Sequence, residues 1–188
     1  MKEIGNLLSD YFAQKAVQEA DKLWDDKVID CSTIEKWKNE HLRTQYWWFM
    51  NSIQRIVLDT NCLLMSIPSK SPYHNVFMSF LRWDYILCIT NEILLEYEEI
   101  ISNKTNSKVA ANIVNAILSR DNILFINPVY RFKLIESDPD DNKFVDCAIH
   151  SNAKYIVSQD KHFGILRDID FPKLDVIDID TFQHILYR

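Results

Sequence analysis

The order of apolar and polar residues after position 52 predicts an alternating series of strands and helices. Short apolar runs rich in β-branched residues predict strands at residues 54–59, 85–89, 122–127, 155–158 and 174–178. Apolar residues at three-to-four spacing predict helices at 73–83, 91–103, 107–119, 141–151 and 180–186, with a short turn near 161–167. This pattern is typical of an α/β fold with a central parallel sheet of about five strands flanked by helices. It leaves the order of the strands open.

Residues 1–49 follow a different pattern, which predicts a two-helix N-terminal extension before a domain at 50–188. Apolar residues between Ile4 and Trp24 fall mostly at helical spacing, and Ser32-Thr33-Ile34-Glu35 matches a capping box that would begin a second helix. An aromatic run, Tyr46-Trp47-Trp48-Phe49, follows. Two short helices cannot bury this much aromatic surface between themselves. We therefore expect the extension to pack on the 50–188 domain, in its own chain or in a dimer mate.

The composition excludes several classes of protein. Hydrophobic residues make up 47% of the 188 residues, enough for a buried core. The chain has only 2 glycines, which excludes the glycine-rich loops of nucleotide-binding proteins. A net charge of −6 argues against a broad basic nucleic-acid surface, but not against a protein that contacts phosphate through metal ions.

The sequence also predicts the compartment and the state of the cysteines. No apolar run approaches the roughly 20 residues of a membrane span, and the N-terminus lacks a secretion signal. We therefore expect a cytoplasmic protein with no membrane partner. The cysteines are far apart and form no Cys-x-x-Cys pair, which favours buried free thiols: Cys31, Cys62, Cys88 and Cys147.

Four acidic residues occupy positions where α/β proteins place their binding sites. Asp59 and Asp160 each follow an apolar strand, so we expect both at the carboxyl edge of the sheet. Glu96 lies on a predicted helix, and Asp141 lies where another begins. Carboxylates within about 4–6 Å raise one another's pKa, which is costly unless a cation binds between them. Oxygen ligands suit Mg²⁺ or Mn²⁺, so the sequence predicts a metal-dependent nuclease.

Each acid also has a simpler interpretation. Asp59 and Asp160 are typical of polar turns after strands, and Glu96 shares an acidic helix face that is usually solvated. Three aspartates precede the helix at 141–151, where one is expected as the N-cap: Asp138, Asp140 and Asp141. Two neutral residues, Asn61 and Ser158, are candidates to hydrogen-bond metal-bound waters.

Four motifs together resemble the PIN-domain ribonucleases, most closely the toxin components of bacterial toxin–antitoxin pairs. The resemblance covers residues 53 to about 180 and is carried by Val57–Asn61, Glu96-Tyr97, Asp140–Phe144 with Ala148, and Ser158–Phe163. It implies that Asp59, Glu96, Asp141 and Asp160 are catalytic and ligate Mg²⁺ or Mn²⁺. It further implies cleavage of single-stranded RNA, an outer-shell role for Asp146, and a homodimer.

A shorter resemblance concerns the N-terminal segment. Ala20–Trp24 and Trp37–Thr44 resemble the toxin-wrapping C-terminal part of a small antitoxin. This implies a nuclease held inactive by its own segment, with Arg43 as the best candidate to reach the acids and Lys38 as the runner-up. A plain helical extension with a solvated end is the alternative. Whether the fusion is natural or engineered stays open.

Two other functions compete with the ribonuclease. One is a non-catalytic PIN-like module that binds RNA or protein, which the presence of all four acids disfavours. The other is a phosphatase of the haloacid dehalogenase type. That enzyme would require a second aspartate two residues after Asp59, where this chain has Asn61.

Overall fold

Five parallel strands form the central sheet in the part of the chain that this computed structural model describes, residues 53–187. The sheet has the order β3-β2-β1-β4-β5. The strands are β1 Arg55–Leu58, β2 Ile86–Ile89, β3 Ile123–Phe125, β4 Tyr155–Val157 and β5 Val176–Ile177. The expected parallel sheet is confirmed, and every strand lies within its predicted range.

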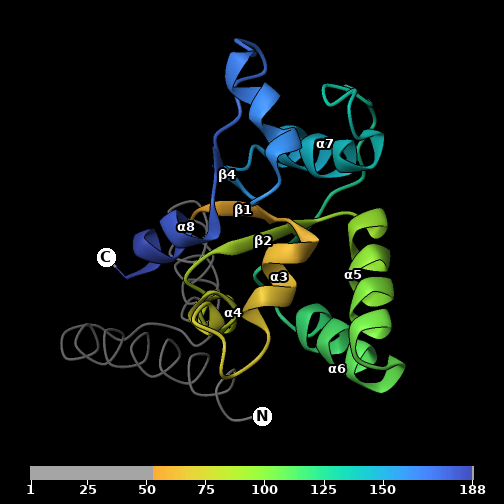
Figure 1. Cartoon of the computed structure of the whole chain (residues 1–188), viewed down its shortest axis with the longest axis vertical. Coiled ribbons are helices and arrows are strands. Elements are labelled where there is room, and N and C mark those ends of the chain that lie inside the picture. Colours follow the sequence, from red (N-terminus) through yellow and green to blue (C-terminus); the bar gives the residue numbers. More distant parts are fainter. Residues whose placement is uncertain (1–52, 188) are drawn as a thin grey trace, which may run out of the picture. The chain divides into compact units, whose positions relative to one another are not determined.

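Helices flank this sheet, as the pattern predicted (Figure 1). The α-helices are α3 Thr60–Ser66, α4 His74–Leu81, α5 Asn91–Lys104, α6 Ser107–Leu118, α7 Asn142–Ser151 and α8 Ile179–Leu186. Two 3₁₀ helices, η2 Pro139–Asp141 and η3 Lys161–Asp168, precede α7 and follow β4. Side-chain caps fix several of the starts. Thr90 accepts a hydrogen bond from the Ile93 N–H at the start of α5, and Asn106 accepts one from the Val109 N–H at the start of α6.

Helix α3 was not predicted from the sequence. It has seven residues and begins directly after Asp59, at the end of β1. Two turns are too short for helical periodicity to show, and opposite faces of α3 carry buried residues, such as Thr60 and Cys62. Its effect on the site is direct, because it turns the chain at Asp59 and fixes the direction of that side chain.

The order of the strands creates a switch point between β1 and β4. The chain runs outward from β1 through β2 to β3, then returns to place β4 on the other side of β1. Leu58 is in register with Val157, so β1 and β4 end at the same level. Connections leave the sheet in opposite directions at such a point, and a crevice opens beyond the carboxyl ends of the strands.

The core lies around β1. Ile56, Val57 and Leu58 are buried, and α7 packs on β1, β2 and β4. The free cysteines Cys62, Cys88 and Cys147 are buried, as expected for these three.

Several predictions concern residues that the structure does not describe. The two-helix extension, the candidate inhibitory residues Arg43 and Lys38, and Cys31 all lie outside residues 53–187. Within the described range, none of the helices has the length and apolar character needed to cross a bilayer.

Candidate active site at the carboxyl edge of the sheet

Asp59 and Asp160 lie at the ends of the neighbouring strands β1 and β4. The Asp59 N–H donates to the Val157 carbonyl at 3.0 Å, which continues the ladder between the strands. The Ser158 hydroxyl donates to Asp59 Oδ2 at 2.8 Å and accepts from the Asp160 N–H at 3.0 Å. Ser158 therefore orients Asp59 and holds the backbone of Asp160, a direct contact with the acids rather than one through water.

Glu96 reaches the same place from α5. The Thr60 hydroxyl donates to Glu96 Oε1 at 2.6 Å, and the Lys143 ammonium lies 2.5 Å from Glu96 Oε2. The next residue, Tyr97, is fully buried and donates its hydroxyl proton to the Leu58 carbonyl. This hydrogen bond fixes α5 against the end of β1, so Glu96 points toward Asp59.

Asp141 occupies the N-cap position of α7 but makes no side-chain capping bond with a described residue. Capping is done by Asp138, which accepts a hydrogen bond from the Asp140 N–H at the start of η2. Asp141 Oδ2 is buried and has no hydrogen-bond partner among the described residues. Of the three aspartates that precede α7, Asp138 therefore caps η2, and Asp141 is left facing the other acids.

The charges of these residues act on one another. Burial raises the pKa of Asp141 to about 6, and the nearby Asp138, Asp160 and Asp59 contribute to this rise. Burial also raises the pKa of Asp59, with contributions from Glu96 and Asp160 that the hydrogen bond from Ser158 partly offsets. Asp59 is thus close enough to Glu96, Asp141 and Asp160 for their charges to repel one another.

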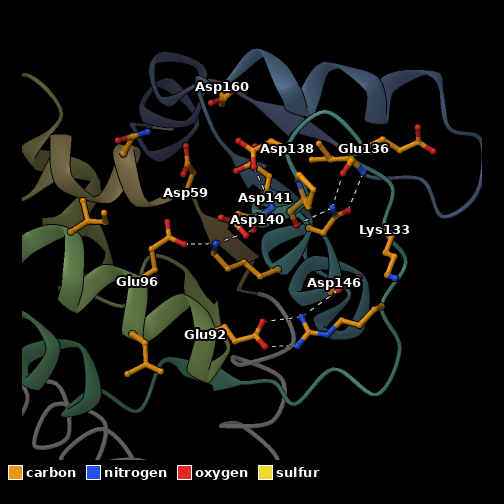
Figure 2. Close-up of a pocket in the computed structure, with 18 of the residues that line it drawn as sticks. Asp59, Glu92, Glu96, Lys133, Glu136, Asp138, Asp140, Asp141, Asp146 and Asp160 are labelled. Carbon is orange, nitrogen blue, oxygen red and sulfur yellow. Dashed lines mark hydrogen bonds and ion pairs between the residues drawn. The ribbon is translucent and has the colours of Figure 1, made fainter.

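The four acids line one pocket, shown in Figure 2, that we call the acidic pocket. Its lining includes ten carboxylates and three cations, so its net charge is strongly negative. The cations are Arg131, Lys133 and Lys143. Asn61 also lines the pocket, and its supporting role stays a prediction.

A histidine that was not among the predicted site residues lies beside three of the aspartates. His162 Nδ1 is 3.3 Å from Asp160 Oδ1, 3.6 Å from Asp138 Oδ2 and 3.8 Å from Asp141 Oδ2. Ligand atoms of Asp138, Asp141 and His162 lie within 4.8 Å of one another. The signal was the position of His162 in the turn after β4, where its backbone N–H donates to Asp160 Oδ1 at 2.9 Å.

Asp146 makes different contacts. It is fully buried, and its Oδ1 accepts a hydrogen bond from the Phe132 N–H at 2.9 Å. Its Oδ2 lies 3.7 Å from Arg131 Nη1. Asp146 therefore anchors the loop before α7, a role that its place on an amphipathic helix could not have indicated.

The donor set suits a hard divalent cation. All four acids offer carboxylate oxygens, their charges are only partly balanced, and Asp141 presents a buried oxygen without a hydrogen-bond partner among the described residues. Asp59, Glu96, Asp141 and Asp160 therefore have the ligand chemistry that Mg²⁺ or Mn²⁺ requires. Lys143 pairs its positive charge with Glu96.

A protein-family model described as the PIN domain matches residues 55–162, more than half of the chain. The chain belongs to the PIN-domain family. This confirms the family predicted from the four motifs. Residues 1–43 match a family described only as one of unknown function (DUF8507), so the likeness of this segment to an antitoxin stays a prediction. No curated protein matches the chain.

The PIN domain also resembles solved structures at low identity. The DNA-bound VapBC of Salmonella typhimurium is 16% identical, with a TM-score of 0.49 over 68% of this chain and 99% of that chain. VapBC2 of Rickettsia felis, bound to a DNA fragment from its promoter, is 17% identical, with a TM-score of 0.48 over 66% of this chain and 98% of that chain. The PIN domain endonuclease Utp24 is 15% identical, with a TM-score of 0.41 over 66% of this chain and 84% of that chain.

Proposed function

We propose that this PIN-domain protein is a Mg²⁺- or Mn²⁺-dependent endoribonuclease of toxin type that cleaves phosphodiester bonds of single-stranded RNA in the cytoplasm. One observation carries the proposal. Asp59, Glu96, Asp141 and Asp160 come from four different elements and line the same pocket at the switch point between β1 and β4. The raised pKa values of Asp59 and Asp141 support a site built to hold a cation.

The chain's own residues hold the site in place. Ser158 orients Asp59, Thr60 orients Glu96, and the turn at His162 holds Asp160. When bound, a divalent cation lowers the pKa of a coordinated water and neutralises charge on the phosphate. Neither Asp59 nor Glu96 has to move far for this, because both carboxylates already face the pocket (Figure 2).

RNA cleavage by the full chain, and by the same chain carrying Arg43→Ala so that autoinhibition does not hide the activity, tests this proposal. Fluorescent single-stranded RNA, double-stranded RNA and single-stranded DNA are incubated with Mn²⁺, Mg²⁺ or EDTA. Asp59→Asn should abolish metal-dependent cleavage of single-stranded RNA, because it removes one of the charges that hold the cation. Asp170→Asn is the matched control, since Asp170 is exposed and lies outside the pocket. If Asp59→Asn cleaves RNA as fast as the wild type, the role assigned to Asp59 is wrong.

The same assay distinguishes a ribonuclease from the alternative, a non-catalytic PIN-like module. Such a module would bind RNA in the presence of Mn²⁺ and leave it intact at every protein concentration. Purification of the Asp59→Asn variant beside the wild type excludes a contaminating nuclease, because a contaminant would copurify equally with both.

We also propose that residues 1–49 inhibit the nuclease, in the same chain or across a homodimer. The support is the sequence resemblance of this segment to the C-terminal part of an antitoxin. Arg43→Ala in the full chain should increase cleavage and metal affinity, whereas Arg43→Lys should keep most of the inhibition, since it keeps a positive charge. If Arg43→Ala and removal of residues 1–49 both leave a folded protein no more active than the full chain, the segment is only structural.

A further inference from the structure

The segment Val129–Lys133 exposes an unusual amount of apolar surface beside the acidic pocket. Val129 is 86% exposed, Tyr130 71% and Phe132 37%, and the cations Arg131 and Lys133 alternate with the two rings. We call these residues the 129–133 segment. Exposed apolar side chains clustered on a loop usually mark a binding surface.

The 129–133 segment is held firmly on α7. The Phe132 N–H donates to the buried Asp146 carboxylate at 2.9 Å, and the Tyr130 N–H donates to His150 Nε2 at 3.3 Å. The Phe132 ring lies 5.9 Å from the imidazole of His150, in an edge-on arrangement, and 6.4 Å from the Tyr130 ring. The backbone of the segment and the Phe132 ring are therefore held in place, which reduces the entropy lost when a ligand binds.

The segment also forms one wall of the acidic pocket. Arg131 and Lys133 line the pocket, whereas Tyr130 and Phe132 do not. Cations thus face the pocket, and the two rings lie outside its lining. Lys133 has a φ of 54°, a left-handed conformation that is uncommon for a lysine and often occurs at functional sites.

The cations of the pocket differ in how far their charge is already balanced. Arg131 forms two hydrogen bonds with Glu92 and lies near Asp146, and Lys143 pairs with Glu96. Lys133 forms no ion pair with any residue in the 53–187 range, and Figure 2 shows its side chain apart from the labelled carboxylates. Lys133 is therefore the pocket cation most available to a phosphate.

We propose that the 129–133 segment binds single-stranded RNA beside the bond to be cleaved, with Lys133 on a phosphate and the rings of Tyr130 and Phe132 stacked on bases. This inference rests on the proposed ribonuclease function and names the surface that positions its substrate. Exposed rings interleaved with cations are the usual platform for single strands, because every base has a face that can stack. A protein partner fits less well, since the segment leads directly into a pocket suited to metal and phosphate.

Binding is measured with full-length Asp59→Asn protein in Mn²⁺, so that cleavage does not consume the probe. The probe is a fluorescein-labelled single-stranded RNA of roughly 12 nucleotides, within the range of single-strand sites, and the readout is fluorescence anisotropy. Tyr130→Ala should weaken binding by about 5- to 100-fold, the effect of losing one stacked base. Tyr130→Phe should restore it, because the ring is kept.

Lys133→Gln should weaken binding and reduce the slope of log Kd against log salt by about 0.7, the value for one phosphate contact to a single strand. Two exposed residues away from the pocket provide matched controls: Tyr187→Ala and Lys108→Gln. Thermal unfolding should show that every variant is folded. RNA that carries 4-thiouridine should also cross-link to Tyr130 or Phe132, as mapped by mass spectrometry.

The outcomes separate this inference from the nuclease proposal. If neither the wild type nor its Arg43→Ala variant cleaves RNA but Tyr130→Ala lowers RNA affinity, the nuclease proposal fails and the binding surface stands. If the wild type cleaves RNA but Tyr130→Ala and Lys133→Gln bind like their controls, the binding surface is refuted. It is refuted as well if Asp59→Asn protein binds no RNA, or if Tyr130→Ala disrupts only self-association.

Discussion

Replacing Asp141 by asparagine should stabilise the metal-free protein, although the residue lies in the proposed active site. Its pKa rises from the ordinary 3.8 to about 6, mainly through burial and then through neighbouring aspartates. Each pKa unit corresponds to about 1.4 kcal/mol, so the full shift corresponds to about 3 kcal/mol. The side chain is 17% exposed and faces His162, which lowers the gain. We expect an increase of about 1–2 kcal/mol in the free energy of unfolding near neutral pH.

The pH dependence follows from the direction of the shift. The folded pKa of Asp141 lies above the unfolded value, so the folded protein binds the proton more tightly than the unfolded chain does. The destabilisation is therefore complete above about pH 6, decreases as the pH falls through the folded pKa, and disappears below the unfolded value. The advantage of Asp141→Asn over the wild type should fall to about half between about pH 7.5 and pH 5.

Urea and thermal unfolding in EDTA test this prediction at both pH values, with Asp170→Asn as the control. For a chain of this size, Asp141→Asn should raise the Tm at neutral pH by roughly 2–8 °C. Excess Mn²⁺ should then raise the Tm of the wild type more than that of the variant, because the variant lacks a ligand. The reasoning is refuted if Asp141→Asn in EDTA is no more stable than the wild type, or if its advantage grows as the pH falls.

Single contacts in and near the pocket lead to three further predictions. Glu96→Gln should reduce metal-dependent RNA cleavage by at least about tenfold, whereas Glu98→Gln on the exposed face of the same helix should not change it. If the Glu96→Gln variant cleaves RNA as fast as the wild type, Glu96 has no role in the reaction. Lys143→Met removes the cation that competes for Glu96, so Mn²⁺ affinity measured by calorimetry should rise by up to about tenfold; unchanged or weaker binding would contradict this. Asn142→Ala breaks two buried hydrogen bonds with Ile135 and should lower the free energy of unfolding, measured by urea denaturation, by about 2–4 kcal/mol. A decrease below about 0.5 kcal/mol would show that water replaces these hydrogen bonds.

The sequence was sufficient for the fold class and for the positions of the acids along the chain. Apolar runs predicted every strand. The signal was clearest for the inner strands β1, β2 and β4, which are covered on both faces and must be apolar throughout, and weaker for the half-buried edge strands β3 and β5. Aspartates directly after two such runs indicated the carboxyl edge of the sheet, where Asp59 and Asp160 are found. Helix α3 escaped detection because seven residues contain too little of the helical period.

Only the tertiary structure decided how these pieces meet. The return of the chain from β3 to a position beside β1 places Asp160 near Asp59, and no local pattern encodes that choice. Because of the same packing, Asp141 faces the other acids while Asp138 caps η2. This packing also pairs Lys143 with Glu96 across the pocket. Asp146 contacts the 129–133 segment for the same reason. Local sequence reports burial and periodicity, which depend on neighbours along the chain. Contacts between side chains on different elements depend on strand order and helix packing, and these are set by the fold as a whole.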